Sequence, residues 1–260
     1  MIDFSKLIDA SIPTEAGEKQ LLKIESGGTV IWKHRSISPI SLEVEKRTTS
    51  WGETKIMLAV YGTSGDSAKV TYGGLTKVIN FSSSDAHLVF FGSYSGNVDE
   101  VETPESGTLT IEGDVKAVGI SNQYSGACYC ITGINNWGPV EYLPYYAFVG
   151  CKSLDVSYIP EGITQIQVCA FLACDAITRI RIPSTVTEIG ASAFKRCSNL
   201  ATVIMDATTP PSIGNSYDSL PFAECPNLTE IIVPAGCGDA YRTATYWDKY
   251  ADIIIEASGG

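Results

Sequence analysis

The 260-residue chain is long enough to bury two hydrophobic cores or one elongated core. Its 29 acidic and 18 basic residues give a net charge of −11. This balance argues against a nucleic-acid partner, which needs clustered Lys and Arg, and against attraction to anionic membranes. No apolar run approaches the roughly 18 residues of a membrane span, so we expect no direct membrane insertion.

Residues 1–35 are predicted to form an N-terminal helix/β-hairpin segment. A helix or turn is expected around residues 4–10, followed by two strands that flank Gly27-Gly28. The first residues lack a basic stretch followed by an apolar core, so we expect no signal peptide at this end. Either a signal was removed or the protein reaches its destination by another route. The strand–Gly-Gly–strand ending in "VIWK" resembles short N-terminal pieces of phage virion proteins.

Residues 36–122 are predicted to form an immunoglobulin-like β-sandwich. Short runs of alternating or continuous apolar residues recur about every ten positions, separated by Ser, Gly, Asp and Asn, which is typical of this class. The expected strands are 41–46, 55–62, 68–74, 76–81, 87–94, 107–113 and 115–121. Gly113-Asp114 is predicted to be a tight hairpin turn.

Residues 123–257 are predicted to form a short leucine-rich-repeat solenoid, because one pattern recurs four times. A Phe is followed three residues later by a Cys and, after three more, by an aliphatic residue; the Cys-to-Cys steps are 23, 23 and 28 residues. A turn of this length cannot bury its own apolar side, so stacked turns share columns of core residues. The expected columns are Phe148, Cys151, Leu154; Phe171, Cys174, Ile177; Phe194, Cys197, Leu200; and Phe222, Cys225, Leu228.

The segment "IPSTVTEIGASAFKRCSNLATVIM" (182–205) resembles the units of the BspA-like leucine-rich repeat family. The preceding unit, 159–182, is similar but has Gln167 where the family usually has Gly. The resemblance extends over about 137–254. It implies a surface-exposed binding or adhesion role rather than an enzyme, without naming a ligand.

Both ends of the solenoid are expected to be covered by aromatic side chains. Tyr129 and Trp137, in the joint between the two modules, are predicted to cover the first turn. At the far end, residues 238–251 are predicted to form a small helix capped by Asp239. Its aromatic residues are expected to lie over the last turn, because terminal repeats must hide an open core: Tyr241, Tyr246, Trp247 and Tyr250.

The eight cysteines invite a metal or disulfide hypothesis, and the pattern disfavours both. One Cys per repeat gives neighbours about 4.8 Å apart with parallel Cα–Cβ vectors, which suits buried reduced thiols. Cys128-x-Cys130 does not have the spacing of a zinc ribbon. A disulfide from Cys169 or Cys237, which lie off the column, stays open. We therefore expect neither a metal nor a cofactor.

No catalytic constellation emerges from the sequence. Only His34 and His87 could serve as an imidazole base, and nothing places either beside a nucleophile. The acidic stretch 97–107 carries carboxylates that could gather calcium, but its spacing is not that of an EF-hand and a solvated loop is favoured: Asp99, Glu100, Glu102 and Glu105. Phosphate-loop fingerprints are absent. We predict no enzymatic activity.

The candidate binding residues are those that face outward on the repeat strands, which present an extended surface. They are Val156, Tyr158, Arg179, Arg181, Thr202, Ile204, Glu230 and Ile232. An ordinary mixed β surface is the alternative. The second candidate is an aromatic patch on the sandwich, whose members could equally belong to its core: Trp51, Tyr61, Tyr72, Phe91 and Tyr94.

The sequence therefore favours a non-enzymatic adhesion protein that presents a rigid repeat surface to a protein or glycan at a bacterial cell surface. The expected partner is a host or cell-surface macromolecule, and the expected location is extracellular. A phage tail or virion component is the first alternative, with the virion as its location. A carbohydrate-binding accessory module or carbohydrate-active enzyme is the second alternative. Oligomeric state and ligand identity are not encoded in these patterns.

Overall fold

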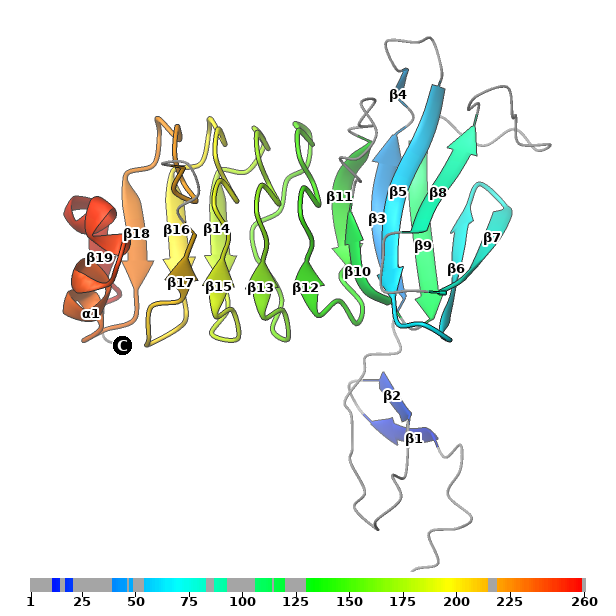
Figure 1. Ribbon diagram of the computed structural model, residues 1–260, viewed down its shortest axis with the longest axis horizontal. Helices are drawn as coiled ribbons and strands as arrows, with labels where there is room; N and C mark the ends of the chain where they lie inside the picture. Colours follow the sequence, from blue (N-terminus) through cyan, green and yellow to red (C-terminus); the bar gives the residue numbers. More distant parts are fainter. Residues whose placement is uncertain are drawn as a thin grey trace, which may run out of the picture.

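The computed structural model of the chain is mainly β, with two short helices at the C-terminal end (Figure 1). The residues that it describes are 11–14, 17–20, 39–45, 47–48, 54–82, 87–92, 106–113, 115–119, 130–214 and 219–258. We refer to residues 39–136 as the N-terminal sheet module and to residues 137–258 as the repeat module.

A small antiparallel hairpin precedes the N-terminal sheet module. It pairs β1 (Ser11–Thr14) with β2 (Gly17–Gln20), with Ser11 opposite Gln20. The helix or turn expected around residues 4–10 and the predicted turn at Gly27-Gly28 lie outside the described residues.

The N-terminal sheet module contains two antiparallel sheets. The first has five strands in the order β11-β3-β9-β6-β7: β3 (Ile40–Glu45), β6 (Ser67–Tyr72), β7 (Leu75–Asn80), β9 (Ser106–Gly113) and β11 (Ile131–Asn136). In the second, β5 pairs with β8 on one edge and with β4 and β10 on the other: β4 (Arg47–Thr48), β5 (Thr54–Gly62), β8 (His87–Gly92) and β10 (Val115–Gly119). Each of the seven predicted strands has an observed counterpart, whereas β4 and β11 were not predicted.

The predicted hairpin turn at Gly113-Asp114 is wrong. Strand β9 pairs with β3 and β6, whereas β10 pairs with β5 in the other sheet, so the chain crosses between sheets here. Gly113 has φ of +116°, and a Cβ at this position would collide with the carbonyl oxygen of Ser67. A Gly-Asp pair is compatible both with a hairpin turn and with a segment that crosses from one sheet to the other. Only the pairing partners of the flanking strands distinguish the two.

The first antiparallel sheet continues beyond the predicted boundary at residue 122. Strand β11 pairs with β3, with Ile134 opposite Leu42, although it falls in the segment 123–146 that was expected to be a joint. Its sequence "ITGINN" contains a glycine and two asparagines, which weaken a strand signal. Irregular register on both sides of Gly133-Ile134 is consistent with this composition.

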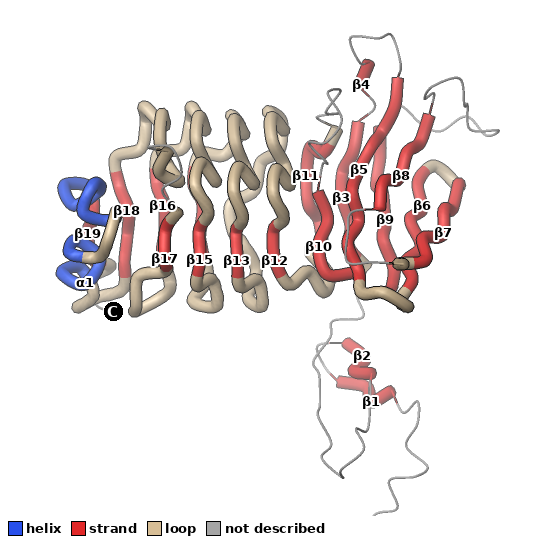
Figure 2. The backbone as a smooth tube through the Cα atoms, in the orientation of Figure 1, coloured by secondary structure: helices blue, strands red, loops and turns tan. Residues whose placement is uncertain are grey.

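The repeat module is built from two parallel ladders, to which successive turns of the chain each contribute a strand (Figure 2). The shorter ladder contains β12 (Tyr142–Leu143), β13 (Gln165–Ile166), β15 (Glu188–Ile189) and β17 (Ser212–Ile213). The longer ladder contains β14 (Arg179–Ile182), β16 (Thr202–Met205), β18 (Glu230–Val233) and β19 (Ile254–Glu256). A bridge between Tyr158 and Arg181 adds the first turn to the longer ladder.

The two modules share one continuous hydrophobic core. The Glu141 amide donates to the Lys116 carbonyl at 2.8 Å, which joins the edge strand β10 to the first turn of the repeats. The Lys116 ammonium is 2.8 Å from the Glu141 carboxylate across the same junction. A Cβ on Gly119 would meet the Ala147 backbone at 2.6 Å, so the close approach of the modules requires glycine there. Figure 1 shows the repeat turns continuing the row of β10 and β11.

The last turn is covered by helix α1 (Gly238–Thr243), the 3-10 helix η2 (Trp247–Ile253) and strand β19. The predicted single helix over 238–251 is interrupted, because Tyr246 has φ of +66° between the two helices. The predicted cap at Asp239 is also wrong: Cys237 occupies the N-cap position, and Asp239 lies in the first turn. Tyr241 and Trp247 are buried as expected, whereas Tyr246 is 37 % exposed.

Candidate binding face

Four phenylalanine rings stack into one column through the repeat module. Ring centroids are 5.1 Å apart for Phe148 and Phe171, 5.0 Å for Phe171 and Phe194, and 5.5 Å for Phe194 and Phe222. Successive rings are within 25° of parallel, as the 23-residue repeat requires when equivalent side chains adopt the same orientation. This column fixes the spacing of the turns and therefore the positions of the side chains on their outer surface.

Aromatic side chains close both ends of this column. Trp137 contacts Phe148 edge-on at 6.1 Å, as expected, while Tyr129 lies outside the described residues. At the far end Trp247 lies 6.5 Å from Phe222 and Tyr250 lies 5.7 Å from it. The Trp247 indole donates to the Pro211 carbonyl at 2.8 Å, so burial of this nitrogen is compensated.

The repeat cysteines form a second column, and the thiols of Cys174, Cys197 and Cys225 are in the reduced form. Each thiol donates to the carbonyl of the Phe one turn earlier: Cys174 to Phe148 at 3.0 Å, Cys197 to Phe171 at 3.1 Å, and Cys225 to Phe194 at 3.1 Å. Burial raises the pKa of Cys197 to about 12, that of Cys225 to about 11, and that of Cys174 well above its usual value. Because the thiolate is the reactive form, this column is structural.

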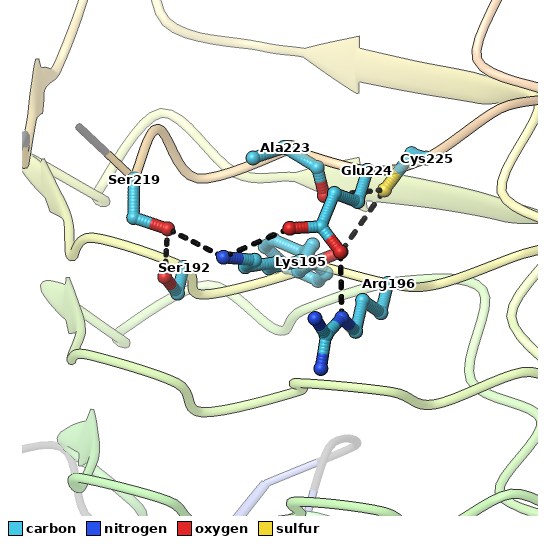
Figure 3. A network of polar contacts seen from close by, with 8 residues as sticks. Ser192, Lys195, Arg196, Ser219, Ala223, Glu224 and Cys225 are labelled. Atoms are coloured by element: carbon cyan, nitrogen blue, oxygen red, sulfur yellow. Dashed lines mark hydrogen bonds and ion pairs between the residues drawn. The ribbon is translucent and has the colours of Figure 1, made fainter.

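A polar network connects the third and fourth turns beside the Cys column (Figure 3). The Lys195 ammonium lies 3.0 Å from the Glu224 carboxylate and donates to Ser219 Oγ at 3.2 Å, and Ser192 donates to the same hydroxyl at 2.6 Å. The Arg196 guanidinium lies 2.6 Å from Glu224, and these two cations lower the pKa of that carboxyl. Lys195 is paired with the Glu224 carboxylate, and no histidine belongs to the network, so it contains no general base for a serine nucleophile. Its role is to link the two turns.

Two rows of outward side chains cross the longer ladder. The strand register aligns Arg179, Thr202 and Glu230 in one row, and Arg181, Ile204, Ile232 and Ile255 in the other. Tyr158 extends the second row beside Arg181. We call these residues the binding face: Tyr158, Arg179, Arg181, Thr202, Ile204, Glu230, Ile232 and Ile255.

The second row exposes apolar side chains at four of its five positions, and the fifth is Arg181. Tyr158 is 49 % exposed and Ile255 is 42 % exposed, while Ile204 and Ile232 are half-buried between them. Arg181 holds Asp206 with its Nε at 2.7 Å, and this hydrogen bond raises the pKa of the guanidinium. Its charge is therefore paired with Asp206, while the Arg181 side chain stays exposed on the face.

The first row carries two charges at opposite ends. Arg179 and Glu230 are exposed, and neither forms an ion pair within the part of the chain that the structure describes. They lie two strands apart, a Cα separation of about 10 Å. The binding face is thus basic over β14, apolar over β16 and acidic over β18.

Seven of the eight predicted outward residues lie on the binding face, and Val156 does not. Val156 is only 5 % exposed. The first turn contributes a single bridge residue and no extended strand, so the alternation that was extrapolated from later turns does not hold there. Ile255 was missed; the apolar run "IIIE" at 253–256 carried the signal for the strand that contains it.

The predicted aromatic patch on the N-terminal sheet module does not form a surface site. Tyr72 and Phe91 are buried and meet edge-on at 5.7 Å. Tyr61 packs against Tyr142 at 6.4 Å across the junction with the repeats. Trp51 and Tyr94 lie outside the described residues.

The other chemical candidates provide no site. His87 lies edge-on to Phe81 at 5.2 Å, and its Nε2 is buried without a hydrogen-bond partner among the described residues. His34 and the acidic stretch from Asp99 to Glu105 lie outside them. In the ranges that the structure covers, no group of three or more His, Cys, Asp or Glu side chains could hold a metal ion. No helix in those ranges is long and apolar enough to cross a membrane.

The stacked parallel turns, their shared Phe and Cys columns and the exposed strand face define a leucine-rich-repeat protein. Residues 120–248 match the family described as the BspA type leucine rich repeat region, in six copies, so the C-terminal half of the chain belongs to that family. The resemblance drawn from residues 182–205 is confirmed. No curated protein matches the chain. Members of this family generally mediate protein binding or adhesion.

Proposed function

We propose that this chain is a non-enzymatic protein-binding component of a bacterial cell surface. In this proposal an immunoglobulin-like β-sandwich carries a short leucine-rich-repeat solenoid, and the binding face contacts a macromolecular partner. One observation carries the proposal: a row of partly exposed side chains from Tyr158 to Ile255, apolar except at Arg181, runs across strands that share a rigid core. Exposed contiguous apolar surface flanked by charge is typical of protein interaction sites.

Rigidity supports this role as much as composition does. Beneath the face, Ile180, Val203 and Ile231 are fully buried, and each outward side chain is fixed by the register of its strand. A surface that is already ordered loses little conformational entropy on binding. A partner can therefore bind without rearrangement of the repeats.

The first experiment determines location, by antibody labelling of intact producing cells together with proteomics of any phage particles that they release. Label on unbroken cells supports the proposal. Enrichment in particles instead supports a tail or virion component, and detection only in the cytosol contradicts both. Two residues of the aromatic patch on which the sugar-binding alternative rests, Tyr72 and Phe91, are buried and cannot stack on a sugar.

The second experiment tests the face itself against arrayed matrix proteins and glycans. Ile204→Asp changes a half-buried position and Tyr158→Ala an exposed one. Each removes apolar surface from the second row and should weaken any specific capture by tenfold or more. Glu188→Arg, on the shorter ladder, is the matched surface control and should bind as the unchanged protein does. Equal loss from all three variants, or from none, would contradict a role for the binding face.

A further inference from the structure

The first row of the binding face is self-complementary in charge about its middle strand, β16. In the second row Ile204, on β16, has Arg181 and Tyr158 on one side and Ile232 and Ile255 on the other. In the first row Thr202, on the same strand, lies between Arg179 and Glu230. Two opposite charges therefore lie at equal distances from β16, and the apolar ends of the second row lie two strands away from it on each side.

A two-fold axis that runs parallel to β16 in the plane of the face exploits this arrangement. Rotation about it places β14 of one copy over β18 of the other, because it reverses the order of the strands and keeps their direction. Arg179 then opposes Glu230 of the second copy, twice. Ile204 opposes its own equivalent at the centre, Tyr158 opposes Ile255 at both edges, and Arg181 opposes Ile232 between them. In an isologous interface both copies use the same patch, so each contact between two different residues occurs twice about the axis.

We propose that the occupant of the binding face is a second copy of this chain, in a face-to-face dimer with β16 on the two-fold axis. This inference rests on the proposed function, since it names the partner of the same face. Charge complementarity supports it: Arg179 and Glu230, which are exposed and form no ion pair among the described residues, both gain a partner. The half-buried Ile204 loses its remaining contact with water, and Ile232 is covered by the Arg181 side chain of the second copy.

The face is small for a stable dimer interface. Five neighbouring chain segments at about 4.8 Å spacing and four residues at about 3.3 Å rise give a patch of roughly 20 by 13 Å. This is smaller than the ~800 Å² per partner of standard stable interfaces. We therefore expect a weak dimer, which must be sought over a wide concentration range.

Charge exchange tests the geometry directly, by sedimentation velocity of the full chain between about 1 and 300 μM. The unchanged protein should shift from monomer to dimer within this range. R179E places two Glu–Glu pairs at the interface and E230R places two Arg–Arg pairs, so each alone should weaken dimerisation by at least about tenfold. An equimolar mixture of R179E and E230R should form a heterodimer at least as well as the unchanged protein, because both cross-copy pairs become attractive again.

The control is E188R, which makes the same charge reversal on the first residue of β15 in the shorter ladder. It should dimerise as the unchanged protein does. Circular dichroism of every variant should be unchanged, because the three substituted side chains are exposed. A mixture that stays monomeric while the unchanged protein dimerises would overturn the proposed axis, and a protein that stays monomeric up to 300 μM would overturn the dimer.

Failure of the dimer and failure of the proposed function give different results. If the protein stays monomeric but Ile204→Asp abolishes capture of an arrayed protein, the binding face serves a different partner and only the dimer is wrong. If the protein stays monomeric and face variants leave all capture unchanged, both proposals are wrong. A dimer that responds to R179E, E230R and their mixture as expected supports the second copy as the occupant.

Discussion

The thiol of Cys197 donates a hydrogen bond to the backbone carbonyl of Phe171, one turn earlier in the repeat module, across 3.1 Å. The same carbonyl accepts the Cys174 amide of its own turn at 3.3 Å. One backbone oxygen thus joins a local turn and a contact between turns, and the pattern recurs at Phe148 and Phe194. The recurrence explains why the Cys position repeats as regularly as the Phe position.

Cys197→Ala should lower the free energy of unfolding by about 1–3 kcal/mol, because it removes a buried sulfur together with its hydrogen bond. Cys237→Ala is the matched control, since that thiol is only partly buried and its nearest acceptor is 3.8 Å away. It should cost about 0.5 kcal/mol or less. Urea denaturation of both variants measures the difference, and equal effects would contradict a structural role for the thiol column.

Stability should fall as the pH rises above about 9. The folded pKa values of Cys197, about 12, and Cys225, about 11, exceed those of unfolded thiols, so unfolding releases protons in this range. The stabilising contribution is fully present below the unfolded pKa and is lost as the pH rises toward the folded values. Burial also raises the pKa of Tyr241 and Tyr250, which adds a loss of the same sign above pH 10. Thermal melts from pH 7 to pH 11 measure this dependence, and a melting temperature that stays constant would contradict it.

Gly190→Ala should destabilise the repeats by about 1–3 kcal/mol, because the new methyl group would lie 2.5 Å from the Val168 amide nitrogen of the preceding turn. Gln167→Ala is the control at the equivalent position one turn earlier, where a side chain is already accommodated. It loses one hydrogen bond, from the Tyr145 amide to Oε1 of Gln167 at 3.0 Å, and should cost less than about 1 kcal/mol. The opposite order of melting temperatures would show that the turns do not approach most closely at Gly190.

Leu200→Ala should cost about 2–5 kcal/mol, the usual effect of emptying a fully buried leucine site. Leu228 occupies the equivalent position one turn later, where it is only partly buried against the core. Leu228→Ala should therefore cost distinctly less. Chemical denaturation of the two variants provides the comparison, and a Leu200→Ala curve identical to that of the unchanged protein would show that the proposed register is wrong.

Two buried tryptophans should respond differently to replacement by phenylalanine. Trp247 donates to the Pro211 carbonyl, so Trp247→Phe should cost about 1–3 kcal/mol. The Trp137 nitrogen is buried without a hydrogen-bond partner among the described residues, so Trp137→Phe removes an unsatisfied donor. It should change stability by less than about 1 kcal/mol. A larger loss for Trp137→Phe in calorimetry would show that this nitrogen has a partner.

The repeat columns could be predicted because they depend on a single fixed period. Equivalent residues 23 positions apart must stack when each turn buries its apolar side against the next, so Phe171 and Phe194 follow from the spacing alone. The outward positions followed from alternation along a strand, which holds wherever a regular strand exists, as at Arg179 and Arg181. It did not hold at Val156, where the turn has no strand.

Tertiary pairing decided the remaining features. Gly113 marks a change of direction in either a hairpin or a crossover, and only the partners of β9 and β10 distinguish the two. The sequence of β11 predicts a strand only weakly, but β11 pairs with the edge of the sheet at β3. The sequence thus determined which residues are equivalent, because equivalence is a property of the period. Only the structure shows that Arg179 and Glu230 lie on opposite sides of β16 in one row. Neighbouring positions on that face come from segments more than twenty residues apart in the sequence.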